Sequence, residues 1–416
     1  MEKNTMPLYL SGADGIRALA CLAVIFHHLT QNLAMQFQTP FIQESQAFFL
    51  LGNAGVSVFF VLSGFLLALP FWKNYFGGGQ FPNMKQYVFR RAARIVPGFY
   101  VAFLVSILLA YLWQVHTEYQ LLRIITGLTF TSGFHYTTLF PSELNGPLWS
   151  ISFEVFSYLL MPLFMLGLFF FGKTRSFSKA ISYWLGVMVV IILLNQGVHY
   201  LFTPDEFQRG WQYGLLGGAK YWMPNYNPIG FFGQFAIGII ASAVTVKLFS
   251  GSPRVEKFKQ KGGFDAISVL SLACTFFFIF QMRHMMEFGF SLQNQPYYFP
   301  IFPLLVAIAL STATHSLWFG KLLDNVVFRF TAKVSFGLYI WHYLVIMAVE
   351  RYWAQDFVYM GVTEFNTWVM ISFVVLLVSY MIATLSFYFV EKPVLDWAYK
   401  KGNQSKSEPV VPKKAG

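Results

Sequence analysis

Long apolar runs recur along the whole chain and leave little choice of environment. Of the 416 residues, 56% are hydrophobic and only 11% are charged, and the mean hydropathy is +0.52. A helix needs about 20 mostly apolar residues to cross a bilayer, and segments of that length follow one another along the sequence. The chain is therefore predicted to be an all-α, polytopic integral membrane protein.

We predict ten membrane-spanning helices. Their expected ranges are 13–34, 53–72, 97–117, 148–171, 181–202, 228–249, 265–283, 297–315, 334–353 and 367–390. Residues 1–392 are predicted to form one membrane domain, because neither an internal repeat nor a second folded domain is visible. The basic tail, 393–416, is expected to be disordered. The first run lacks a small-residue cleavage site, so it is expected to act as its own insertion signal.

The basic residues divide unevenly between the two sets of loops. Of the 29 Lys and Arg residues, 23 fall on the side that holds both termini and 5 on the other, with Arg17 inside the first helix. Because basic loops remain in the cytoplasm, both termini are predicted to be cytoplasmic. The net charge of +11 thus marks topology rather than a nucleic-acid-binding surface. Cys21 and Cys274 both lie in apolar runs, which excludes a disulfide framework and a thiolate metal site.

The first helix, DGIRALACLAVIFHHLT, carries ionisable groups inside an otherwise apolar run. Such groups are costly in a bilayer and are usually functional. At about 100° per residue, Arg17 and His28 return to within about 20° of one face, about 16 Å apart along the axis. His27 points about 80° away from that face. The helix therefore offers a cation near the cytoplasm and a proton acceptor in the outer half of the bilayer. A purely structural role for both histidines remains an alternative.

The fourth helix runs in the opposite direction and carries a carboxylate. It begins near Trp149, so Glu154 is expected about 8 Å below its outer end, at a depth comparable to that of His28. The two side chains are expected either to pair, or to act separately with Glu154 reaching toward interfacial water. Tyr158 follows four residues later and shares the face of Glu154. His342, in the ninth span, is a further intramembrane histidine with a structural or a catalytic role.

An arginine cluster follows the second span on the predicted cytoplasmic side. Arg90, Arg91 and Arg94 lie in KQYVFRRAARIVP, which predicts a short helix that ends at Pro97. Guanidinium groups bind phosphate well, although a topological anchor is the simpler explanation of the cluster.

Two segments have less specific patterns. The small residues of the second span are Gly55, Ser57, Ser63 and Gly64, and they predict close packing against a neighbouring helix. The outer loop 203–227 is rich in Trp, Tyr, Asn and Gly, which suits either a sugar-binding surface or an ordinary membrane interface.

Five stretches together resemble one family, the bacterial membrane-bound acyltransferase-3 family. They are DGIRALACLAVIFHH, GVSVFFVLSGFLL, RRAARIVP, LWSISFEVFSYLLMPL, and SFGLYIWH together with FVEKP. Their order and spacing extend the resemblance over essentially the whole chain.

The resemblance implies a multi-pass enzyme of the bacterial inner membrane. Such an enzyme transfers an acyl group, usually acetyl, from cytoplasmic acyl-coenzyme A to a hydroxyl of an extracytoplasmic acceptor, commonly an envelope polysaccharide sugar. It implies no tightly bound cofactor, with acyl-CoA as the donor substrate. The expected partners are therefore acyl-CoA, a hydroxyl-bearing glycan and the lipid bilayer, without nucleic acid.

The resemblance also suggests roles for individual residues. The arginine-then-histidine motif of the family falls on Arg17 and His28, which makes His28 the expected base, and the acidic position of its W-S-x-S-x-E motif falls on Glu154. Its R-x-x-R element falls on Arg91 and Arg94, which implies a role in handling the donor together with Arg17. Tyr158 joins His28 and Glu154 in the predicted catalytic set.

The chain departs from the family pattern in two positions. Many members have acids where this chain has Ser57 and Val155, so a role for those carboxylates is not expected here. Some relatives carry a hydrolase-like domain after the last span, and none is visible in this sequence. The rival functions are a transporter of a glycan or small molecule and a signalling scaffold. Within the enzyme hypothesis, direct transfer and an acyl-enzyme on His28 or Ser63 both remain open.

Overall fold

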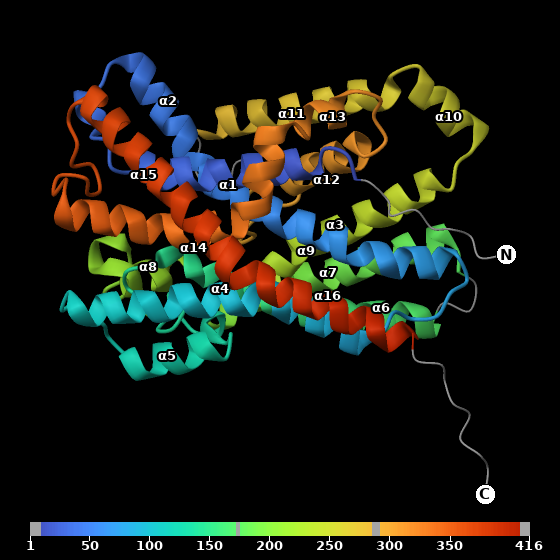
Figure 1. Cartoon of the computed structure of the whole chain (residues 1–416), viewed down its shortest axis with the longest axis horizontal. Helices are drawn as coiled ribbons and strands as arrows, with labels where there is room; N and C mark the ends of the chain where they lie inside the picture. Colours follow the sequence, from blue (N-terminus) through green and yellow to red (C-terminus); the bar gives the residue numbers. More distant parts are fainter. Residues whose placement is uncertain (1–9, 172–174, 285–291, 408–416) are drawn as a thin grey trace, which may run out of the picture.

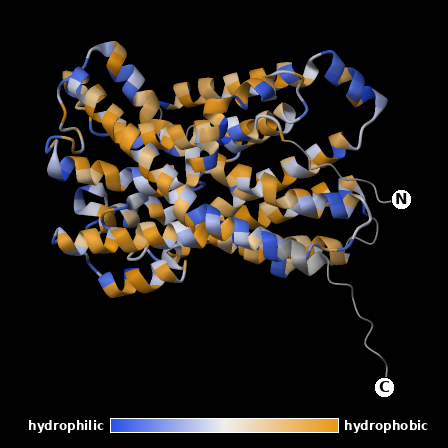
Figure 2. Ribbon diagram, viewed as in Figure 1, coloured by the Kyte–Doolittle hydropathy of each residue, from blue (hydrophilic) through white to orange (hydrophobic). Residues whose placement is uncertain are grey.

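The computed structural model describes residues 10–171, 175–284 and 292–407. Within these ranges the chain forms helices and no β-strand, apart from an isolated bridge between Leu33 and Val362. The long helices run side by side along the longest axis of the molecule (Figure 1). Most residues along these helices are hydrophobic, as expected of helices that face lipid (Figure 2). The predicted all-α membrane fold is confirmed.

Nine helices in the described part of the chain are long and apolar enough to cross a membrane. They are built on α1 (Ala13–Thr30), α3 (Gly55–Phe76), α4 (Met84–Leu112), α6 (Trp149–Phe171), α7 (Phe177–Leu201), α9 (Pro228–Phe249), α11 (Gly263–Met282), α14 (Val326–Tyr352) and α15 (Phe365–Ser386). The eighth predicted span, 297–315, corresponds to α12 (Ile301–Ala313), whose 13 residues reach only about 20 Å. This apolar helix is shorter than the hydrocarbon layer, about 30 Å thick.

Helix α4 corrects the prediction for the arginine cluster. The sequence predicted a short helix that ends at Pro97, but α4 continues through this proline to Leu112 and has 29 residues in all. Pro97 removes one backbone hydrogen bond, to the carbonyl of Ala93. The helix persists on both sides because backbone groups in a bilayer have to be satisfied within the protein. Arg91 and Arg94 therefore belong to the same rigid helix as the membrane span.

Two further segments are more ordered than predicted. Between α1 and α3, where a loop was expected, lie α2 (Pro40–Leu50) and the short 3₁₀ helix Leu51–Ala54. After α15, the tail expected to be disordered forms α16 (Lys392–Ser407) as far as the structure describes it. This helix packs on α4, with the rings of Trp397 and Phe89 5.1 Å apart. Helices α1 and α16 respectively begin and end toward the same end of the bundle, at the right in Figure 1.

The packing of α3 against α9 lies at the centre of the bundle. A Cβ added at Gly64 would lie 2.1 Å from the carbonyl oxygen of Phe235, and one at Gly238 would lie 2.0 Å from that of Val61. The two backbones therefore touch through a pair of glycines, one on each helix. Gly55 is equally close to α1, since its Cβ would lie 2.5 Å from the carbonyl oxygen of Ala20. The packing role predicted for the small residues of α3 is confirmed for its two glycines, Gly55 and Gly64.

Candidate active site

A cavity of about 110 Å³ lies inside the bundle, among α1, α3, α4, α6 and α14. We call it the central cavity. Five of the six residues predicted for the site line it, namely Arg17, Arg91, Arg94, Glu154 and Tyr158. Ser63, Ser150 and Tyr339 add hydroxyl groups to the same lining. Five separate stretches of sequence are thus brought to one polar centre in an otherwise apolar bundle.

The carboxylate of Glu154 has two hydrogen-bond donors in this cavity. It accepts a short hydrogen bond from the hydroxyl of Tyr158, one helical turn away, and a second bond from Oγ of Ser63 at 3.3 Å. The side chain of His28 instead bonds to Gln31. The structure therefore gives Glu154 and His28 different partners, although their predicted depths match.

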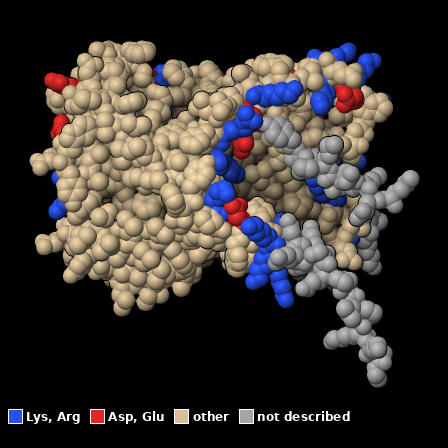
Figure 3. All heavy atoms as spheres, in the orientation of Figure 1, with Lys and Arg blue, Asp and Glu red and all other residues tan. Residues whose placement is uncertain are grey.

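A second, larger cavity of about 460 Å³ adjoins the first, and we call it the basic cavity. The two cavities share Arg17, Arg91 and Arg94. The other charged residues of its lining are Asp14, Arg90, Arg329 and Lys333. Figure 3 shows Lys and Arg side chains gathered around a hollow in one face of the molecule. This hollow lies some way in from the end of the bundle where α16 terminates. Arg17, Arg91 and Arg94 are thus common to the basic cavity and to the polar centre of the bundle.

His28 lies in a cluster of aromatic rings formed by α1 and α14. Its ring centroid is 4.8 Å from that of His27, 5.3 Å from that of His342 and 5.0 Å from that of Tyr343. The ring of Tyr339, which lines the central cavity, lies 6.3 Å from that of His342. A line of ring contacts therefore joins the central cavity to His28.

The three histidines differ in what holds them. His27 donates Nδ1–H to the carbonyl of Leu50 at 2.6 Å, and the fully buried His342 donates Nδ1–H to the carbonyl of Leu338 at 2.9 Å. Both bonds tie a ring to backbone. His28 has a side-chain partner instead, Gln31. These contacts favour a structural role for His27 and leave His28 as the more adaptable imidazole.

The two positions that lack the acids of the family are filled in different ways. Ser57 is fully buried and donates to Oε1 of Gln234 at 2.7 Å, and Gln234 in turn donates to the carbonyl of Pro296 at 2.7 Å. Ser57 thus takes part in a neutral hydrogen-bond chain between α3, α9 and the loop before α12. Val155 packs against the hydrophobic core.

Several lining residues escaped the sequence-based prediction. Arg329 and Lys333 stand four residues apart on α14, and that spacing on one helix face was a usable signal. Tyr399 and Leu395 lie on α16, in the segment that was expected to be disordered. Gln31 lies one turn after His28 and ends α1. Among the described residues, no group of three or more His, Cys, Asp and Glu side chains is placed to hold a metal ion.

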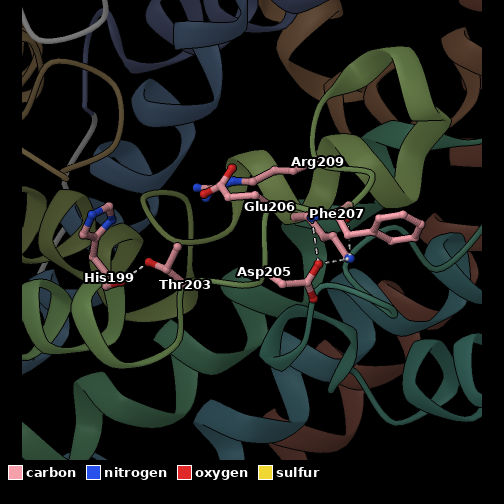
Figure 4. A network of polar contacts seen from close by, with 7 residues as sticks. His199, Thr203, Asp205, Glu206, Phe207 and Arg209 are labelled. Atoms are coloured by element: carbon pink, nitrogen blue, oxygen red, sulfur yellow. Dashed lines mark hydrogen bonds and ion pairs between the residues drawn. The ribbon is translucent and has the colours of Figure 1, made fainter.

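The loop after α7, predicted to lie on the outer side, is held by ion pairs (Figure 4). The buried ammonium of Lys220, on α8 (Gly214–Trp222), lies 3.1 Å from Oδ1 of Asp205 and donates to the carbonyl of Phe207 at 2.8 Å. The hydrogen bond from Lys220 lowers the pKa of the Asp205 carboxyl below its ordinary value. Arg209 pairs with Glu206 beside them. This part of the loop is therefore a folded surface.

Comparison with known proteins agrees with this arrangement. Residues 10–384, which include every lining residue named above except those of the last helix, match the family described as an acyltransferase domain. The chain belongs to the membrane-bound acyltransferase-3 family. It is therefore a multi-pass membrane protein of an acyltransferase family, and the predicted resemblance is confirmed.

The similar proteins include bacterial O-acetyltransferases. The chain is 27% identical to the O-acetyltransferase OatA of Staphylococcus aureus, over 100% of this chain and 61% of that protein. It is 25% identical to the peptidoglycan O-acetyltransferase OatA of Listeria monocytogenes, over 93% of this chain and 56% of that protein. The chain thus spans less than two thirds of the length of these relatives. No solved structure matches it significantly.

Proposed function

We propose that this protein is a membrane O-acyltransferase that moves an acetyl group from coenzyme A, held at the cytoplasmic side, to a hydroxyl on the outer side. The observation that carries the proposal is a set of three arginines that line two adjoining cavities. Arg17, Arg91 and Arg94 line both the basic cavity and the central cavity, so one set of cations joins a recessed basic surface to a polar centre inside the membrane bundle. Family membership and the similarity to O-acetyltransferases support the same chemistry.

The negative charge of the donor matches the positive charge of these two cavities. Coenzyme A carries several phosphates at one end and its thioester at the end of a long neutral arm. Guanidinium groups bind phosphate through charge-assisted, often bidentate hydrogen bonds. Arg91 and Arg94 hold the phosphates near the basic cavity, and Arg17 lines the path by which the thioester end reaches the bundle centre.

His28 acts as the base in the transfer step. The acceptor oxygen attacks the thioester carbonyl carbon, and His28 takes the hydroxyl proton as the new C–O bond forms. The C–S bond then breaks, and the coenzyme A thiolate leaves and is reprotonated. A well-placed general base contributes roughly 10²- to 10⁴-fold to the rate. Glu154 and Tyr158 shape the polar end of the path, because their mutual hydrogen bond fixes both side chains at the central cavity.

The acceptor is proposed to be a sugar hydroxyl of an envelope glycan. The Listeria relative is named as a peptidoglycan O-acetyltransferase, and the outer loops here, including the folded loop around Lys220, offer a surface at the end of the bundle where such a glycan would lie. On this proposal residues 1–392 form the catalytic membrane domain, with the protein in the bacterial cytoplasmic membrane.

Inside-out membrane vesicles test the proposal directly. Labelled acetyl-coenzyme A is supplied outside the vesicles, and label is counted in base-labile esters of envelope glycan. We expect label with wild type, none with His28→Gln, and normal label with His116→Gln, which changes an exposed histidine after α4. Full activity of His28→Gln would remove the proposed base. Solute flux without thioester consumption would indicate a transporter.

A further inference from the structure

Part of the lining of the basic cavity has no role in the function proposed so far. Arg329 and Lys333 of α14 and Tyr399 of α16 line this part of the cavity, together with the arginines of α4. Arg329 and Lys333 are one helical turn apart and share a face. The guanidinium of Arg90 lies over the ring of Tyr399 at 5.3 Å, so α4 and α16 are in contact beside the cavity.

The charge of this cavity is strongly unbalanced. Among its described lining residues are six cations, the five arginines at 17, 90, 91, 94 and 329 together with Lys333, against one carboxylate, Asp14. The Nε–H groups of Arg17 and Arg90 are buried and have no hydrogen-bond partner within the described part of the chain. Buried donors without acceptors are unfavourable unless a ligand supplies the acceptor. The cavity is therefore built for a compact ligand with several negative charges.

Helix α16 is fixed in place as part of this cavity. The ring of Trp397 packs against that of Phe89, and the ammonium of Lys401 lies 5.2 Å and 5.8 Å from the centroids of these two rings. On α14, Lys333 donates to the hydroxyl of Tyr388 at 2.8 Å, which places its ammonium at the same wall. The ring of Tyr399 is about half exposed, at 48%, so a flat group has access to it.

We propose that the wall formed by α14 and α16 binds the nucleotide end of coenzyme A. Arg329 and Lys333 bind the 3′-phosphate, and the ring of Tyr399 stacks on the adenine, as aromatic side chains do on nucleobases. Arg91 and Arg94 then hold the diphosphate nearer the central cavity. This inference rests on the proposed function, because it assumes that coenzyme A is the donor. It assigns a binding role to three residues and to the C-terminal helix.

The 3′-phosphate gives a specific test. The full chain is purified into phosphatidylcholine nanodiscs, and the binding of coenzyme A and of 3′-dephospho-coenzyme A is measured by calorimetry. We expect wild type to prefer coenzyme A by about tenfold or more, since charge-assisted hydrogen bonds are worth that much. Arg329→Gln and Lys333→Gln lose most of this preference while their affinity for the dephospho form stays near that of wild type.

Matched controls separate this site from general surface charge. Arg254→Gln and Lys257→Gln remove exposed cations of α10 (Pro253–Gln260), on the same predicted side of the membrane, and are expected to keep the preference. Tyr399→Leu weakens both ligands to the same extent, and Tyr399→Phe restores the binding because the ring is retained.

The outcomes distinguish an error in the proposed donor from an error in the binding role assigned to α14 and α16. If wild type binds neither ligand, the proposed donor is wrong and the proposed function fails with it. If wild type binds both ligands equally, or if Arg329→Gln and Lys333→Gln keep the preference, only the assignment of this wall is overturned. If phosphatidylglycerol in the nanodiscs blocks coenzyme A binding, an anionic lipid headgroup occupies the basic cavity and the assignment is likewise overturned.

Discussion

Gln31 fixes the position of the proton on His28, because its carbonyl oxygen Oε1 accepts a hydrogen bond from Nδ1–H of His28 at 3.1 Å. A neutral imidazole carries one proton, so Nε2 of His28 retains its lone pair and is the nitrogen able to act as a base. Gln31 lies one turn after His28, at the end of α1. The partner of the proposed base is therefore a local one, from the same helix.

The first prediction concerns this bond. Gln31→Leu frees the imidazole to rotate and to adopt the other tautomer, so the turnover rate is expected to fall about tenfold or more. The KM for acetyl-coenzyme A is expected to stay constant, because Gln31 lies outside both donor cavities as the structure describes them. Gln31→Glu retains an acceptor oxygen and is expected to restore much of the rate. Equal losses in both variants would argue against the tautomer effect.

The second prediction separates the two adjacent histidines. His27 bonds to the backbone carbonyl of Leu50, and its role is proposed to be structural. His27→Gln is therefore expected to lower the thermal stability of the purified protein while retaining most of the transfer activity per folded molecule. His28→Gln is expected to show the reverse pattern, with near-normal stability and activity reduced by 10² or more. Measuring both variants by thermal denaturation in detergent and by labelled acetyl transfer checks the pair together.

The third prediction concerns the pair of Glu154 and Tyr158. Their hydrogen bond lies inside the central cavity, so each side chain holds the other in place. Glu154→Gln and Tyr158→Phe are each expected to reduce turnover, and the double variant is expected to lose less than the product of the two single losses. Such coupling is typically about 0.5–3 kcal/mol for residues in contact. A double-mutant cycle on the transfer rate gives this value, and strict additivity would contradict the proposed unit.

The ranges of most spans and the ionisable residues within them could be predicted from sequence, because membrane helices have a strong length and hydropathy signal. Local proline rules were less reliable. Pro97 predicted a helix end, but α4 continues because the bilayer offers its backbone no other partners. The tail after Pro393 is basic and polar, yet it forms a helix whose Trp397 ring packs against that of Phe89 on α4. No local pattern predicts such a contact.

The sequence singled out side chains that line one cavity, but it did not predict how they are connected. Arg17, Arg91, Arg94, Glu154 and Tyr158 all line the central cavity, and their roles stay a prediction. The contact of His28 with His342 joins residues more than 300 positions apart, so periodicity within one helix carries no information about it. The same holds for the wall of the basic cavity, where α14 and α16 come together only in three dimensions.

The fourth prediction concerns the pH dependence of the outer loop. The hydrogen bond from Lys220 lowers the pKa of Asp205 in the folded loop below the value of 3.8 expected for the unfolded chain. The ionised carboxylate therefore stabilises the loop at pH values above 3.8. This stabilisation is lost as the pH falls through the lower pKa of the folded loop. Amide hydrogen exchange of residues 203–222 is expected to accelerate across this acidic range in wild type. In Asp205→Asn the exchange is expected to be faster at neutral pH and to lose this acid-dependent step. An unchanged step in the variant would assign it to another group.

The last prediction concerns the glycine contact between α3 and α9. A Cβ at Gly238 would lie 2.0 Å from the carbonyl oxygen of Val61, and neither backbone has room to move because both helices are buried around this point. Gly238→Ala is therefore expected to force α3 and α9 apart and to destabilise the protein by about 1–3 kcal/mol, as overpacking does. Gly186→Ala, on α7, is the matched control, since a Cβ there meets no described atom within 4 Å. It is expected to leave stability unchanged or to raise it slightly, because alanine favours the helix. The measurement is the temperature at which half of the detergent-purified protein loses its monodisperse peak. A clear fall for Gly238→Ala, absent in Gly186→Ala, would identify this contact as a main determinant of the bundle that holds Ser63 at the central cavity. Equal stability of the two variants would mean that the helices separate without cost.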